Sequence, residues 1–239
     1  ADDLQGAVGA NWAKKLGAKT AYVIDDTELY GKGIADVFVT TAAKLGITVA
    51  GRDGIDGKAS DYRAVATKVR AAKPDAVYYG GITQNNAGKL LKDLRAAGVE
   101  APFIGPDGIF EDAFIKDAGD DAEGVYCTFG GVPVSAYTGD AKVFAEKYAK
   151  LHGGNPEAYA IYGYEMTKVA LAAIAKVNVK DRAAIRDAVF ATKDFKGILG
   201  TWSFDANGDT TLTTMSVNEI KRTAEGKLDF ELIEVVSAG

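Results

Sequence analysis

Two polar side chains, Asp107 and Tyr30, stand at points of the sequence that favour ligand binding. Asp107 comes just after the short apolar run 103–104, and Tyr30 comes shortly after the apolar run 21–24. Each run predicts a buried parallel strand, and ligands of open parallel α/β sheets bind outside the carboxyl ends of the strands. A carboxylate there can hold an ammonium through a charge-assisted hydrogen bond. A tyrosine there can cover the ligand with its ring and bind a polar group with its hydroxyl.

Both residues also have purely structural interpretations. Asp is common at helix N-caps, so Asp107 could cap the helix expected to start near Glu111. Tyr30 could pack beneath the helix that follows it. The residues alone leave these alternatives open.

A glycine pair extends this candidate site. Gly80 and Gly81 interrupt the apolar run 76–79 and allow a backbone to approach a ligand closely. Ile82 and Thr83 continue the same turn. We therefore count all four residues as candidate ligand-binding positions, and none as a catalytic or metal-binding one.

No pattern in the sequence indicates catalysis or metal binding. There is no Gly-x-Ser-x-Gly motif, and the single Cys127 lies mid-strand, where a small core residue is expected. The neighbouring carboxylates Asp25 and Asp26 would point apart on a strand and form a poor acid–base pair. Segment 205–209 begins like a calcium loop but has no terminal Glu, and a hairpin turn at Asn207-Gly208 explains it better. We expect no enzyme activity and no cofactor.

Composition and charge indicate a globular chain without a nucleic-acid partner. The chain has 239 residues, of which 47% are hydrophobic and 26% charged, and its net charge is -5. It has no basic run of the kind that binds nucleic acid. No apolar stretch approaches the ~20 residues of a spanning helix. The abrupt start at Ala1, without a signal peptide, leads us to expect a mature or cut form.

Strand-like and helix-like segments alternate over the first half of the chain. The expected strands are 21–24, 47–50, 76–79, 103–104 and 124–129; the expected helices are 2–16, 33–45, 61–72 and 87–94. This alternation predicts a doubly wound parallel α/β sheet with helices on both faces. After a linker at 131–138 the pattern becomes helical, with helices expected at 140–152, 157–177 and 181–191. Strands are expected at 200–204, 211–221 and 228–235, which suggests two lobes.

Seven short motifs occur in an order that resembles a known family. They are DDLQG (2–6), LYGKG (29–33), DAVYYGG (75–81), IGPDG (104–108), DDAEG (120–124), YAIYGY (159–164) and FDANGD (204–209). Together they resemble the branched-chain amino acid (Leu/Ile/Val) binding proteins of bacterial ABC importers, over essentially the whole chain. The resemblance implies the type I periplasmic-binding fold, in which two flavodoxin-like lobes close on a free amino acid. It also implies a periplasmic location, or a lipid-anchored exterior one, and a membrane permease as partner.

The resemblance also assigns roles to individual residues. Tyr30 matches a ligand-contacting tyrosine of the second lobe, and Asp107 matches the acidic residue that binds the α-ammonium. Ile82 stands where leucine-binding members have a second ligand tyrosine, which implies an altered side-chain pocket. Tyr159 falls near an aromatic residue that borders this pocket in some members.

Members of the family carry further chain before the DDLQG motif, and that chain supplies most of the first lobe. The resemblance therefore implies a complete second lobe, formed by 1–131 with 217–239, and a remnant of the first lobe at 132–216. Four explanations of the short first lobe are open: a proteolytic remnant, a deliberate truncation, a naturally short relative, or a first half supplied as a separate chain. Without most of the first lobe, the contacts that hold the closed form are lost, so we expect the chain alone to bind leucine less tightly than micromolar.

Three other functions stay open at this point. The first is an amide, urea or aromatic-acid receptor of the same fold, because Ile82 departs from the leucine pattern. The second is a regulatory protein that senses a ligand by lobe closure. The third, an α/β enzyme using the same strand edge, is the least favoured, because no nucleophile–base set accompanies the edge.

Overall fold

The computed structural model describes residues 2–237 and divides into two compact units. The larger unit comprises Asp2–Val132 and the chain from Thr214 onward, and the smaller unit comprises Pro133–Thr213.

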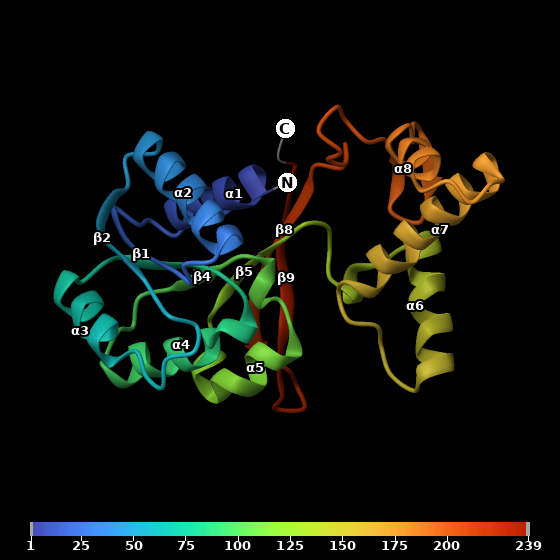
Figure 1. Ribbon diagram of the computed structural model, residues 1–239. Coiled ribbons are helices and arrows are strands. Elements are labelled where there is room, and N and C mark those ends of the chain that lie inside the picture. Colours follow the sequence, from blue (N-terminus) through green and yellow to red (C-terminus); the bar gives the residue numbers. More distant parts are fainter. Residues whose placement is uncertain (1, 238–239) are drawn as a thin grey trace. The chain divides into compact units, whose positions relative to one another are not determined.

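A seven-stranded sheet forms the centre of the larger unit (Figure 1). In spatial order its strands are β2 (Thr48–Gly54), β1 (Thr20–Asp25), β3 (Ala76–Gly80), β4 (Phe103–Gly105), β5 (Tyr126–Phe129), β8 (Thr214–Arg222) and β9 (Leu228–Ser237). The first five strands are parallel to one another, and β8 and β9 extend the sheet in antiparallel fashion. The mostly parallel sheet confirms the α/β class that the alternating segments predict.

Helices cover both faces of this sheet. They are α1 (Asp2–Lys15), α2 (Leu29–Lys44), α3 (Arg63–Ala72), α4 (Ala87–Ala96) and α5 (Asp112–Ala118). Helices α1 and α2 pack together on one face, and α3, α4 and α5 line the other (Figure 1). Three short 3₁₀ turns, η1 (Thr83–Asn85), η2 (Asp107–Ile109) and η3 (Gly119–Ala122), complete the connections.

The central strand β3 explains why the sheet needs a helical layer on each side. All five of its residues are buried, and successive side chains of a strand point to opposite faces. Tyr78 stacks on Phe38 of α2 with 4.0 Å between ring centroids, whereas Tyr79 stacks near Phe103, on the neighbouring strand β4, at 6.0 Å. An apolar run without polar alternation therefore becomes a strand that is buried on both faces.

The smaller unit is mainly helical. Its elements are η4 (Val134–Ala136), α6 (Gly139–His152), α7 (Ala160–Val177), α8 (Arg182–Phe190), β6 (Phe195–Gly197) and β7 (Gly200–Trp202). Asp181 caps α8 by accepting hydrogen bonds from the backbone N–H groups of Ala183 and Ala184. The short strands β6 and β7 pair in antiparallel fashion.

The C-terminal part of this unit differs in detail from the expectation. The strand expected at 200–204 ends at Trp202, and its partner is β6, which the sequence pattern did not indicate. The turn at Asn207-Gly208 forms, but its arms make only an isolated bridge between Phe204 and Thr210, with a few backbone hydrogen bonds, and no regular strand pair. Asp205 holds the turn by accepting the N–H groups of Asn207 and Asp209. The Asn-Gly signal thus marks a turn correctly but does not predict a long hairpin.

A buried carboxylate joins α7 to the β6–β7 hairpin. Glu165 is fully buried and accepts hydrogen bonds from the indole Nε1–H of Trp202 at 3.0 Å and the backbone N–H of Ile198 at 3.1 Å. Gly197 passes so close to this carboxylate that a side chain there would clash with it. Glu165 is therefore a direct hydrogen-bonded link between the helix and the hairpin.

Replacing Glu165 with alanine should destabilise the smaller unit by about 3 kcal/mol, because buried N–H donors lose their acceptor and a cavity forms. Thermal unfolding followed by Trp202 fluorescence in a Trp12→Phe background measures this effect. The exposed Glu157→Ala serves as the matched control. Equal melting temperatures for the two variants would contradict this role of Glu165.

Candidate ligand-binding site

The candidate residues of the larger unit gather at the carboxyl edge of its parallel strands. Tyr30 lies in the first turn of α2, which follows β1. Gly80 ends β3, and Asp107 opens the 3₁₀ turn that follows β4. Because β1, β3 and β4 are parallel neighbours, these three positions lie along one edge of the sheet. This is the edge at which open α/β sheets bind ligands.

Tyr30 and Asp107 are in direct contact. The hydroxyl of Tyr30 donates a hydrogen bond to Oδ1 of Asp107 at 2.7 Å, although 77 positions separate the residues in the sequence. Asp107 does not cap α5, because the residue at that N-cap position is Glu111. Neither side chain is fully buried. The structure therefore brings together a carboxylate and a phenol that are both partly exposed.

A buried thiol lies behind this pair. Cys127 is fully buried in β5, as expected for a core residue. Burial, and secondly the negative charge of Asp107, raise the pKa of the Cys127 thiol well above its usual value. Cys127 is thus a neutral neighbour of Asp107 and not a nucleophile.

The turn after β3 packs against the turn after β4. The hydroxyl of Thr83 donates to the carbonyl oxygen of Gly108 at 3.2 Å. A Cβ atom at Gly108 would lie 2.5 Å from the carbonyl oxygen of Gly81 and 2.9 Å from Cγ2 of Ile82. A glycine at position 108 is therefore needed for the two turns to approach this closely. Thr83 is buried, whereas Ile82 is partly exposed at the edge.

Tyr159 belongs to the smaller unit. It immediately precedes α7, and 43% of its surface is exposed. Its place in the ligand site remains a prediction.

Two neighbouring carboxylates at the end of β1 have separate partners. Asp25 accepts hydrogen bonds from Nη2 and Nε of Arg52 at 2.9 and 3.2 Å. Asp26 instead accepts from the side chain of Asn85 and the backbone of Ile82, in the turn after β3. The expectation that these residues point apart holds. Sequence reasoning nevertheless missed that Asp26 touches the site, because its partners are almost sixty positions away.

The candidate residues at this edge suit ligand binding, and the described part of the chain places no nucleophile–base set beside them. Among residues 2–237, no group of three or more His, Cys, Asp or Glu side chains could hold a metal ion. A carboxylate, a phenol and a glycine-rich turn suit the reversible capture of a small cation-bearing molecule. The fold and site therefore define a binding module.

Comparison with known proteins agrees with this class. A family model described as "Periplasmic binding protein" matches residues 2–227, and the chain belongs to this family. An amino acid binding protein of Pseudomonas aeruginosa is 31% identical over 91% of the chain and 58% of its own length. The family and this relative are binding proteins and not enzymes.

Two solved structures are similar over nearly the whole chain. A leucine binding protein of Thermotoga maritima has a TM-score of 0.87 and 30% identity, covering 99% of this chain and 66% of that one. A branched-chain amino acid transporter substrate binding protein of Streptococcus pneumoniae, solved with isoleucine, has a TM-score of 0.83 and 26% identity. That match covers 98% of this chain and 65% of that one.

The chain spans about three fifths of the length of the curated relatives that it matches. Family membership indicates an extracytoplasmic location. None of the helices in the described part of the chain is long and apolar enough to cross a membrane.

Proposed function

We propose that the chain is the ligand-capturing part of a periplasmic solute-binding protein. Its ligand is a free amino acid, branched-chain or related, which it delivers to the permease of an ABC importer. The contact between Tyr30 and Asp107 at the carboxyl edge of the sheet is the observation that carries this proposal. The relatives named for leucine and isoleucine support the choice of ligand.

In this proposal each candidate residue has a distinct task. The Asp107 carboxylate accepts hydrogen bonds from the α-ammonium, and the Tyr30 ring forms a wall beside it. Gly80 and Gly81 offer backbone groups, and Ile82 and Thr83 continue that side of the site. Tyr159 would border the ligand side chain from the other lobe. Closure of two lobes would then exclude water and strengthen these contacts.

The division into two units supports the proposed lobes. The larger unit corresponds to the proposed complete second lobe, 1–131 with 217–239, and the smaller unit corresponds to the proposed remnant of the first lobe, 132–216.

A ligand panel tests the proposed function. Chemical-shift titration of the chain with leucine, isoleucine and valine, against acetamide, urea and benzoate, detects even millimolar binding. We expect the amino acids to shift amides of the turns after β3 and β4. Shifts produced only by the amides or by benzoate would instead support the alternative receptor, which Ile82 keeps open. A transport role, as opposed to a regulatory one, predicts that deletion of the gene abolishes uptake and leaves gene induction intact.

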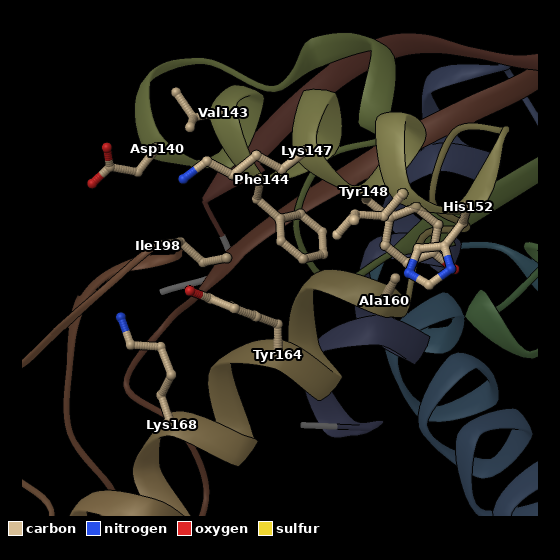
Figure 2. A pocket seen from close by; sticks show the side chains of 11 residues that line it. Asp140, Val143, Phe144, Lys147, Tyr148, His152, Ala160, Tyr164, Lys168 and Ile198 are labelled. Carbon is tan, nitrogen blue, oxygen red and sulfur yellow. The ribbon is translucent and has the colours of Figure 1, made fainter.

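The smaller unit carries a groove, lined by both apolar and charged side chains, that supports a further partner. The groove has a volume of about 570 Å³ and lies between α6 and α7. Phe144 and Tyr164 face each other across it (Figure 2), with 5.1 Å between ring centroids. Leu151, at its rim, is 79% exposed, and α6 has no buried residue. Exposed apolar side chains that gather in one place can mark a contact with another polypeptide.

We propose that this cover is the part of the first lobe that the longer relatives carry. Native mass spectrometry of the chain mixed with the unmatched part of a longer relative is expected to show a one-to-one complex heavier than 25.1 kDa. A chain that stays at 25.1 kDa in this mixture, or forms only a homodimer, would contradict this cover.

A further inference from the structure

Asp26 is a buried carboxylate to which no function has yet been attached. It directly follows β1, and only 2% of its surface is exposed. Its neighbour Asp25 pairs with Arg52, but Asp26 makes no ion pair with any of residues 2–237. Burying a carboxylate in this way is costly unless hydrogen-bond donors surround it, so the donors indicate its task.

Those donors come from both sides of the candidate site. Oδ1 of Asp26 accepts the backbone N–H of Glu28 at 3.2 Å, directly before α2 and two residues before Tyr30. Oδ2 accepts the side-chain amide of Asn85 at 2.7 Å and the backbone N–H of Ile82 at 3.3 Å. One carboxylate therefore joins the turn that carries Tyr30 to the turn that carries Ile82.

Two glycines make room for this link. A Cβ atom at Gly31 would clash with Oδ1 of Asp26, and one at Gly81 would lie 2.7 Å from Oδ2. The carboxylate thus lies against two glycine positions at which any side chain would collide with it.

We propose that Asp26 is a positioning residue that fixes the separation between the Tyr30 side of the site and the Gly81–Thr83 side. Asp107 binds the ammonium in the proposed function, and Asp26 keeps the walls around it at the right spacing. The effect of Asp26 on ligand affinity rests on the proposed function. Its effect on the two turns does not.

The test uses an amide swap. In Asp26→Asn, one acceptor oxygen becomes an NH₂ group, which must face either the N–H of Glu28 or the donors of Asn85 and Ile82, so the link should break on one side. We expect amide exchange at Glu28 or at Ile82 to accelerate at least tenfold and affinity for isoleucine to fall about tenfold. In Asn85→Asp, two carboxylates would face each other, and a similar loss of affinity is expected. The double variant D26N/N85D restores a donor–acceptor pair between the two side chains and should recover part of the lost affinity, whereas exchange at Ile82 should stay fast because the new NH₂ group also faces its N–H.

Asp75 provides the matched control. It joins the same strands at their opposite end, where it accepts the backbone N–H groups of Lys19 and Thr20, each at 2.9 Å. Asp75→Asn should leave exchange at Ile82 and ligand affinity within about twofold of the native values. If the loss of either carboxylate loosened the whole sheet, D75N and D26N would instead accelerate exchange at Ile82 equally.

Three results would overturn the role of Asp26: unchanged exchange at both Glu28 and Ile82 in D26N, the same losses in D75N, or no recovery of affinity in D26N/N85D. If the native chain binds none of the amino acids, the proposed function fails, and the exchange measurements still decide whether Asp26 links the two turns.

Discussion

Asp107→Asn is expected to weaken binding of isoleucine by about 2–4 kcal/mol, or ~30- to 1000-fold in dissociation constant. The substitution keeps the size of the side chain and removes its charge. An ammonium that loses a charged partner in a partly desolvated site forfeits its strongest hydrogen bond. The carbonyl oxygen of the new amide side chain could still accept the hydrogen bond from Tyr30, so the fold should persist. Titration of the native and variant chains by NMR measures the difference.

Two further variants test whether the loss of affinity is specific to the charge of Asp107. Asp120→Asn removes a carboxylate whose side chain is 92% exposed, and it should bind isoleucine as the native chain does. Tyr30→Phe keeps the aromatic wall but loses the hydroxyl that contacts Asp107, and about a tenfold loss is expected from one missing hydrogen bond. Native-like affinity of D107N would place the ammonium site elsewhere.

Gly31→Ala should be strongly destabilising, by about 3 kcal/mol, which is the upper end of the range for an overpacked site. The added methyl group would clash with Oδ1 of Asp26 and lie 2.5 Å from the carbonyl oxygen of Gly80. Because that second neighbour is backbone, it cannot rotate away. Helix α2 would have to shift and carry Tyr30 with it, so ligand affinity should fall as well.

Gly33→Ala is the matched control in the same helix. Nothing lies within 4 Å of a Cβ atom at this position, so the variant should be more stable than the native chain by about 0.5–1 kcal/mol through the helix preference of alanine. Urea unfolding of the two variants measures the contrast. A destabilised G33A, or a G31A as stable as the native chain, would mean that close packing at Gly31 does not control this helix.

Local patterns predicted most of the sheet because they reflect burial that any parallel strand requires. The runs before Asp25, Gly80 and Gly105 are apolar on both faces, and they become β1, β3 and β4. Elements held by distant contacts were harder to predict. Helix α3 begins at Arg63 and not at Asp61, and just before it the N–H of Tyr62 donates to Asp93 on α4 at 2.7 Å. The strand β6 is three residues long and depends on pairing with β7.

The candidate site also combines features that local sequence patterns predict with features that they do not. The edge shared by Tyr30 and Asp107 follows from strand ends, which the sequence marks. The link from Asp26 to Asn85 follows from the spacing of two turns, which no local pattern encodes. Glu165 is similar, because a carboxylate in an amphipathic helix normally predicts an exposed face, and its donors lie more than thirty positions away.

The antiparallel pairing of β5 with β8 has a topological consequence. Phe129 pairs with Ser216, and the whole smaller unit lies between these two residues in the chain. The smaller unit is thus an insertion into a hairpin, and its two attachment points are adjacent strands about 4.8 Å apart. Closing a longer loop costs only about 0.6 kcal/mol for each doubling of its length. The hairpin can therefore accept an insertion of very different size or sequence while the register of the sheet, and with it the candidate ligand-binding edge, stays the same.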